Sequence, residues 1–282
     1  MQIKGCLFFI FLTCQIICFS QTKRFQHLTS ADGISQSEVY TIFEDSRGFM
    51  WFGTVDGLNR YDGYDITIFN TDKNNPNSIS NNTIRSLAED SFGRIWIGTN
   101  DGLCLYNPLS EKIVQVKIAC VENDILLQIR SIIVDNNHIL LATSAGMLRA
   151  NINTTSPDQI GHEFQWVNYS VNHRVSIYDA IKRNDGSIWI ITANALHGMV
   201  FQSESTNPLM IESVTDSRFI NNLALKDDKL GNLWIITHGN GFFRYNPSSK
   251  ELNYFTENLS NRSIVSNMFS DVTTDRNENL WI

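Results

Sequence analysis

Two pairs of adjacent acidic residues, Glu44-Asp45 and Glu89-Asp90, have the residue types of a general acid and a general base. A glycosidase uses two carboxyl groups to donate and to accept protons. Each Asp, however, stands first in a four-residue sequence that ends in glycine, at Gly48 and Gly93, as type I turns prefer. An Asp in that place bonds its own backbone two residues on. We therefore interpret both pairs as turn residues of hairpins and expect no catalytic residue.

Metal-binding patterns are missing from the sequence. The six histidines include no pair at i, i+4 and have no CxxC partner: His27, His138, His162, His173, His197 and His238. Asp275 to Asn279 resembles the start of a calcium loop, but Leu280 stands where that loop requires glycine. Cys104 and Cys120 either form one bridge in an oxidising compartment or, as we favour, are buried small hydrophobic residues. We expect no metal and no cofactor.

Composition excludes two classes of protein. The chain of 282 residues carries a formal charge of -7, so it lacks the basic surface that follows a phosphate backbone, and we expect no nucleic-acid contact. Hydrophobic residues make up 42% and charged residues 18%, which is enough apolar surface for a core and excludes a disordered chain.

Residues 1–20 have the layout of a secretory signal. Lys4 supplies a positive start, Gly5 to Phe19 is an uncharged apolar run, and Ser20 is a small residue suited to cleavage. A retained membrane helix is the alternative, but the run is short for a bilayer. We predict that the mature chain begins near Gln21 and that residues 21–282 form one domain in the periplasm.

A repeat of 44 to 49 residues runs through the rest of the chain. Its anchor position is occupied by five of the six tryptophans and one leucine: Trp51, Trp96, Leu140, Trp189, Trp234 and Trp281. A second turn signal, Asp-Gly, follows the anchor at Gly57 and Gly102. Chance does not place tryptophan so regularly, so we treat each repeat as one structural unit.

Each unit contains four short runs rich in β-branched and aromatic residues, which favour strands. The anchor run, such as IWIGT, is apolar on both faces, as in a strand buried between two sheets. Glycine two places after the anchor, at Gly53 and Gly98, leaves room for the adjacent sheet. The pattern predicts an all-β propeller with four-stranded blades, of which this chain supplies about five and a half. We expect a ring of seven.

The first unit carries the motif of a known repeat. Asp32-Gly33-Ile34-Ser35-Gln36, Asp45, Gly48, Trp51-Phe52-Gly53-Thr54 and Asp56-Gly57-Leu58 resemble the two-component regulator propeller repeat. The likeness is strong in units one and two and looser in units three and four, where Leu140 replaces Trp, Asn137 the turn Gly and Ala195 the second Gly.

The resemblance implies the periplasmic sensor region of a hybrid two-component receptor in Bacteroidetes-like bacteria. Such receptors detect oligosaccharides from polysaccharide breakdown, act as homodimers, and continue through a membrane helix to a histidine kinase. None of those later parts is in this sequence, and the chain ends in mid-strand after Trp281. We therefore expect an amino-terminal piece of a longer protein, anchored in the inner membrane through missing parts, and no enzymatic activity in this chain.

Trp166 is the one tryptophan outside the repeat register, in a longer insert between units three and four. It is a weak candidate for binding a sugar through its ring face. The alternative, which we favour, is an outer-strand residue that covers the edge of a blade.

Two other functions stay open: a secreted propeller enzyme, such as a polysaccharide lyase or glycosidase, and a noncatalytic adhesion scaffold.

The point within the repeat at which the chain begins leads to a further prediction. Phe25 to Ile34 matches the outer strand and lead of later units, so this segment should complete the last blade of a closed ring. Residues 21–282 alone should form an open arc that associates through its bare end.

Overall fold

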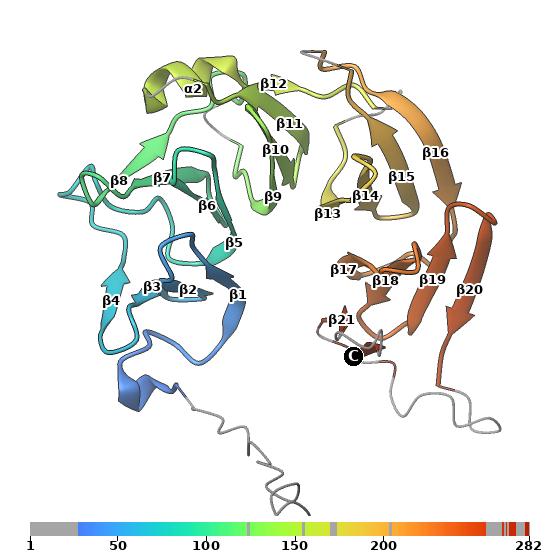
Figure 1. Ribbon diagram of the computed structural model, residues 1–282, viewed down its shortest axis with the longest axis horizontal. Helices are drawn as coiled ribbons and strands as arrows, with labels where there is room; N and C mark the ends of the chain where they lie inside the picture. The colour runs from blue at the N-terminus through green and yellow to red at the C-terminus, as the bar shows by residue number, and fades with distance from the viewer. Residues whose placement is uncertain are drawn as a thin grey trace, which may run out of the picture.

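The computed structural model describes residues 28–122, 125–153, 156–169, 174–202, 205–257, 267, 269, 271–274 and 280–281. The protein is all-β, and its strands form five four-stranded antiparallel sheets that follow one another around an arc (Figure 1). A two-stranded hairpin follows the fifth sheet. This confirms the predicted propeller of four-stranded blades. The segment predicted to close the ring begins outside the described residues, and the seven-bladed ring stays a prediction.

Strands follow chain order within each sheet. Unit one comprises β1 (Val39–Glu44), β2 (Met50–Thr54), β3 (Gly57–Tyr61) and β4 (Ile66–Phe69). Unit two comprises β5 (Ile84–Glu89), β6 (Ile95–Thr99), β7 (Leu103–Asn107) and β8 (Lys112–Val116). Unit three comprises β9 (Ile129–Asp135), β10 (His138–Thr143), β11 (Gly146–Asn151) and β12 (Gln165–Trp166).

The remaining strands repeat the same order. Unit four comprises β13 (Ile177–Lys182), β14 (Ile188–Thr192), β15 (Ala195–Val200) and β16 (Leu209–Thr215). Unit five comprises β17 (Asn222–Asp227), β18 (Leu233–Thr237), β19 (Phe242–Asn246) and β20 (Glu251–Phe255), and the hairpin is β21 (Thr273–Thr274) with β22 (Leu280–Trp281). Two short helices complete the described structure, η1 (Ser30–Asp32) before unit one and α2 (Pro157–Glu163) within unit three.

Apolar layers lie between consecutive units, because the sheets of units two to four each pack one face on the unit before and the other on the unit after. Ile95 and Ile97 face unit one, whereas Trp96 faces unit three. Every residue of β6 is buried for this reason. The same alternation is repeated in units three, four and five, and the last layer joins Trp234 and Phe242 to Val272. The hydrophobic core thus consists of separate layers between sheets, and tryptophan, isoleucine and leucine side chains pack closely in them.

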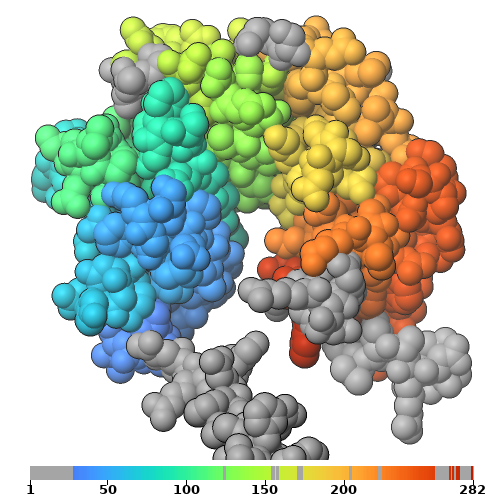
Figure 2. Space-filling view, in the orientation of Figure 1, coloured from blue at the N-terminus to red at the C-terminus, as the bar shows by residue number. Residues whose placement is uncertain are grey.

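The first strand of each unit lies nearest the axis. Strands β1, β5, β9, β13 and β17 contact their neighbours in turn and surround the central hollow (Figures 1 and 2). Each of these strands is interrupted by one extra residue near its start. The pairing skips Tyr40, Arg85, Arg130, Tyr178 and Leu223. Within the described residues no helix is long and apolar enough to cross a membrane.

Candidate functional site

In three units the turn aspartate holds the anchor tryptophan. The indole Nε1 donates to the carboxylate six residues earlier in each case: Trp51 to Asp45 (3.0 Å), Trp96 to Asp90 (2.9 Å) and Trp234 to Asp228 (2.9 Å). The second oxygen of Asp45 accepts the backbone N–H groups of Arg47 and Phe49, both at 3.0 Å. One side chain therefore closes the turn and positions the largest side chain of the inter-unit layer.

These hydrogen bonds favour the ionised carboxylate. Burial raises the pKa of Asp45, but the bonds from Trp51, Phe49 and Arg47 outweigh burial and hold the pKa below its usual range. The same balance lowers the pKa of Asp228, where Asn232 and Trp234 donate. A general acid needs a raised pKa at neutral pH, so neither carboxyl group is suited to proton donation.

The turn of unit two is tied to unit three by a buried ion pair. Arg94 Nε lies 2.7 Å from Asp90 Oδ2, and both side chains are almost fully buried. The terminal nitrogen Nη2 of Arg94 donates to the backbone oxygen of Ile152 at 3.0 Å. The carboxylate of Asp90 therefore has two buried donors, the Trp96 indole and the Arg94 guanidinium.

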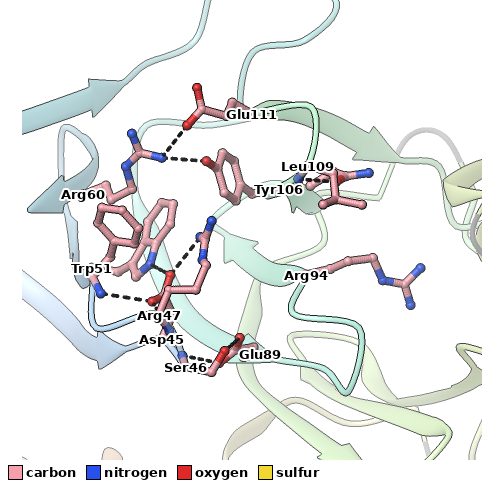
Figure 3. A network of polar contacts seen from close by, with 12 residues as sticks. Asp45, Ser46, Arg47, Trp51, Arg60, Glu89, Arg94, Tyr106, Leu109 and Glu111 are labelled. Atoms are coloured by element: carbon pink, nitrogen blue, oxygen red, sulfur yellow. Dashed lines mark hydrogen bonds and ion pairs between the residues drawn. The ribbon is translucent and has the colours of Figure 1, made fainter. Parts of the chain in front are cut away.

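A polar network also joins units one and two (Figure 3). The backbone N–H and the hydroxyl of Ser46 donate to the Glu89 carboxylate at 2.8 and 2.6 Å. Arg60 Nη1 donates to the hydroxyl of Tyr106 at 2.6 Å and lies 3.4 Å from Glu111. Glu89, one member of the acidic pairs, is thus engaged in contacts between two blades.

Units three and four do not have the turn aspartate that binds the anchor indole in units one, two and five. Unit three joins β9 to β10 through only two residues, and the positive φ of its turn falls on Asn136 (52°) rather than on Asn137. Unit four has Arg183 at the first turn position, because Arg183 and Gly186 make the backbone bonds that Asp45 and Gly48 make in unit one. The Trp189 indole therefore donates to Ser187 Oγ at 3.0 Å instead.

The sequence-predicted anchors differ in burial. Trp51, Trp96, Leu140 and Trp189 are buried, Trp234 is partly buried, and Trp281 is 63% exposed. The turn glycines all adopt positive φ: Gly48, Gly93, Gly57 and Gly102. A Cβ on Gly98 would lie 2.3 Å from Ser86 Oγ and 2.8 Å from a methyl group of Ile129 in unit three. Glycine is therefore required there for the approach of the next sheet.

A threonine hydroxyl is common to all five units. It donates across the second hairpin to a backbone oxygen at 2.7 to 3.1 Å, in Thr54, Thr99, Thr143, Thr192 and Thr237. In unit four the acceptor belongs to Ala195, so the bond survives the loss of the second glycine.

The two cysteines of the domain are free, and no bridge joins them. Cys104 is buried, and its sulfur accepts the backbone N–H of Ser80 at 3.3 Å. Cys120 is exposed, which differs from the burial we favoured from sequence, because it lies in the connection after β8 rather than in a strand. Among the described residues no three His, Cys, Asp or Glu side chains are grouped as metal ligands.

Trp166 lies on β12, the fourth strand of unit three, and not in an insert between units. The insert is α2, which precedes this strand. The indole Nε1 donates to the backbone oxygen of Cys120 at 3.2 Å, and the Arg174 guanidinium lies 3.6 Å from the ring centroid. One face of the ring is therefore occupied by a cation, and a role of Trp166 in sugar binding stays a prediction.

Four residues that we did not single out from the sequence share the extra position of the first strand: Tyr40, Arg85, Arg130 and Tyr178. We call them the bulge row. Arg85 Cζ lies 4.3 Å from the centroid of the Tyr40 ring, and Arg130 Cζ lies 4.8 Å from that of Tyr178. Units one to four thus place tyrosine, arginine, arginine and tyrosine side by side around the axis.

Two segments match a known family. Residues 33–56 and 78–101 match the two component regulator propeller family, and they contain the turn, anchor and threonine of units one and two. Units one and two carry two-component regulator propeller repeats. A curated relative, "Histidine kinase P4" of Formosa agariphila, is 39% identical over 70 residues, which are 25% of this chain and 5% of that protein.

Solved structures share the propeller fold. The extracellular domain of BT3049, described as a hybrid two component system from B. thetaiotaomicron, matches with a TM-score of 0.57 and 16% identity over 91% of this chain and 40% of that chain. That of BT4673, from the same organism, gives 0.60 and 22% over 84% and 34%. Streptogramin B lyase gives 0.64 and 13% over 93% and 80%. The chain therefore spans less than half of either extracellular domain.

Proposed function

We propose that this regulator propeller is a noncatalytic, ligand-sensing domain of a hybrid two-component receptor, placed in the periplasm. The match of units one and two to the regulator repeat carries the proposal. The likeness of residues in this chain to a protein named histidine kinase supports an output through a kinase that this sequence does not contain. The receptor would be held in the inner membrane by parts outside this sequence.

The expected ligand is an oligosaccharide released from a polysaccharide. A propeller suits this role because its blades are rigid and joined by layers such as that between Trp96 and Ile129, so a ligand can move the domain as a body. In a homodimer, which we also propose, such a movement changes the spacing of the two chains at the membrane. The free energy for signalling is then the difference in ligand affinity between the two arrangements.

Calorimetric titration tests this proposal. The purified protein is titrated with a panel of neutral and acidic oligosaccharides, and at least one should bind with a dissociation constant below about 1 mM. A reporter for the genes of polysaccharide use, measured in the native bacterium, should respond to the same saccharide. Heat from none of the panel at millimolar concentration would contradict the proposal.

An enzymatic propeller is the second candidate, and one observation favours it. Streptogramin B lyase resembles this chain in fold over 93% of its length. The contacts of three of the four residues in the acidic pairs speak against it here, because Asp45, Asp90 and Glu89 each bind turn or inter-blade donors. Chromatography of the saccharides after overnight incubation separates the two functions, since a sensor returns its ligand uncleaved.

A further inference from the structure

The bulge row occupies the edge of the sheet that faces the axis. In β5, Ile84 packs into the layer between units one and two, whereas Ser86 Oγ donates to the backbone of Ile129 in unit three at 3.1 Å. The extra residue, Arg85, lies between two residues that point to opposite faces. It therefore enters neither layer, and because β5 borders the central hollow (Figure 1), we place Arg85 on the side of the sheet that faces the axis.

The same geometry holds for the next unit. Ile129 packs against unit two, and Ser131 Oγ donates to Asp179 of unit four at 2.5 Å, so we place Arg130 between them on the side that faces the axis as well. Because β5 and β9 are neighbours at the axis, the two guanidinium groups come from adjacent strands that border the same hollow. Burial lowers the pKa of Arg130, Tyr178 acts in the opposite direction, and the charge of Arg85 lowers the pKa further, so the two cations repel each other.

Neither arginine is neutralised by the described part of the chain. Other arginines, such as Arg47, Arg60 and Arg94, lie within 3.4 Å of a carboxylate. Arg85 and Arg130 have no such ion pair among the described residues. The nearby carboxylate of Glu38 accepts from the Tyr40 hydroxyl at 2.9 Å. That of Asp179 accepts from Ser131 and from the backbone N–H of Leu225 at 2.8 Å.

Both guanidinium groups are nevertheless held in place. Arg85 Nε donates to Asn100 Oδ1 at 2.7 Å, and the ring of Tyr40 supports its plane. Arg130 Nη1 donates to Ser176 Oγ at 2.9 Å and to the backbone oxygen of Ile177 at 3.1 Å, and its Nη2 donates to Gln128 Oε1 at 3.2 Å. Each group keeps N–H donors beyond these bonds, because a guanidinium has five. Two fixed, uncompensated cations with donors to spare are suited to one oxyanion held between them.

We infer that the bulge row binds the carboxylate or sulfate group of a small acidic ligand in the central hollow, with Arg85 and Arg130 as the binding residues. The overall charge of the protein is -7, so this local excess of positive charge is not part of a generally basic surface. Where the ligand is the oligosaccharide proposed above, the inference rests on that function and makes the saccharide an acidic one.

The test uses four probes in calorimetric titrations of the purified protein at constant ionic strength. These are a tetragalacturonate, a sulfated galactotetraose, the neutral galactotetraose and sodium sulfate. At least one acidic probe should bind, and Arg85→Gln and Arg130→Gln should each weaken it by about tenfold or more, as expected for a charged hydrogen-bond donor. Arg244→Gln is the matched control, because Arg244 bonds Asn253 within unit five, and it should leave affinity unchanged. Arg85→Lys keeps the charge but loses the paired N–H donors of the guanidinium, so its affinity for the acidic probe should lie between those of wild type and Arg85→Gln.

A second measurement needs no variant. Hydrogen exchange of the wild-type protein should slow in peptides covering residues 84–86 and 129–131 when the acidic probe is added, and not in β16. Equal affinity of wild type and both glutamine variants, or exchange protection elsewhere only, would overturn the inference. So would binding of the neutral probe alone, although the proposed sensor function would then stand. If no saccharide binds while sulfate binds in an arginine-dependent way, the proposed function fails and the anion site remains.

Discussion

Units one and two differ from units three and four in how they hold the same strand. The first two use a turn aspartate that binds the anchor indole, and both match the regulator repeat. Unit three has Leu140 and a two-residue turn, and unit four has Arg183 and a serine acceptor. All four anchors are nevertheless buried, and all four units keep the threonine bond across the second hairpin.

The comparison separates two contributions to the repeat. Burial of a large apolar side chain between sheets is present in all four of these units, so it determines the fold. The polar turn varies, so it adjusts stability locally and sets the sequence motif. The predictions below test this separation, beginning with the largest expected effect.

Truncation of the anchor should cost about the same in both kinds of unit. Trp96→Ala and Trp189→Ala should each lower the free energy of unfolding by about 3–5 kcal/mol, because both side chains are buried and leave a cavity. Urea denaturation followed by circular dichroism measures the loss. A loss for Trp189→Ala below half of that for Trp96→Ala would show that the aspartate, and not burial, is decisive.

Trp166→Ala is the control for the anchor variants. This side chain is only partly buried, on the outermost strand of unit three, so its removal should cost much less. If it also binds a sugar, the variant should lose affinity in the titrations above. Equal losses of stability for Trp96→Ala and Trp166→Ala would contradict the distinction between anchor and outer-strand tryptophan.

Removal of the side chain at the first turn position should lower stability strongly in unit two, where it is a carboxylate. It should lower stability much less in unit four, where it is an arginine. Asp90→Ala leaves the buried Arg94 without its ion-pair partner and the Trp96 indole without an acceptor, which should cost about 3 kcal/mol. Arg183→Ala removes a bond to the backbone oxygen of Gly231 at 3.0 Å and two long ion pairs with partly exposed carboxylates, those of Asp185 and Asp227, and should cost about 1 kcal/mol. Equal shifts of the urea midpoint would argue that position one of the turn acts in the same way in every unit.

The sequence predicts the repeat, the strands and the turns well because these depend on local patterns: a tryptophan every 44 to 49 residues, Asp-x-x-Gly and alternating apolar runs. It did not predict Arg183 as a turn residue, although Arg183 stands six residues before its anchor as Asp45 does, because arginine is not among the residues that favour the first position of such a turn. The bulge row was missed because the extra residue breaks the two-residue alternation. A signal existed, as Tyr40, Arg85 and Tyr178 each stand eleven residues before their anchor.

A methyl group added at a glycine should lower stability more where the next sheet packs against the anchor strand than in an open turn. Gly98→Ala places a methyl group against Ser86 and Ile129, and relief of that clash should cost about 1–3 kcal/mol. Gly186→Ala meets no atom within 4 Å but keeps a φ of +82°, so it should cost about 1 kcal/mol. Thermal melts of the two variants measure the difference. A larger loss at Gly186 would mean that turn strain outweighs contact between sheets.

The smallest expected effect is a difference in how stability depends on pH between two aspartates. Asp45 is in the turn of unit one, and Asp179 is on the first strand of unit four. The folded-state pKa of Asp45 lies below that of an unfolded Asp, about 3.9, so its contribution is present above that pH and is lost as pH falls through the folded-state pKa. Asp179 behaves in the opposite way. Burial raises its pKa and outweighs the bonds from Ser131 and Leu225, so its protonation stabilises the fold as pH falls toward 3.9 from above.

The two windows therefore lie on opposite sides of about pH 4, and urea midpoints measured from pH 7 to pH 2.5 separate them. Asp45→Asn should flatten the loss of stability below pH 4 and leave the region above it unchanged. Asp179→Asn should remove a gain of stability on acidification above pH 4, since the amide takes the place of the protonated acid at every pH. An unchanged slope above pH 4 in Asp179→Asn would show that this carboxylate is ionised at low cost, held by Ser131 and the backbone of unit five. Asp179 would then be a polar link between blades of the same kind as the turn aspartates.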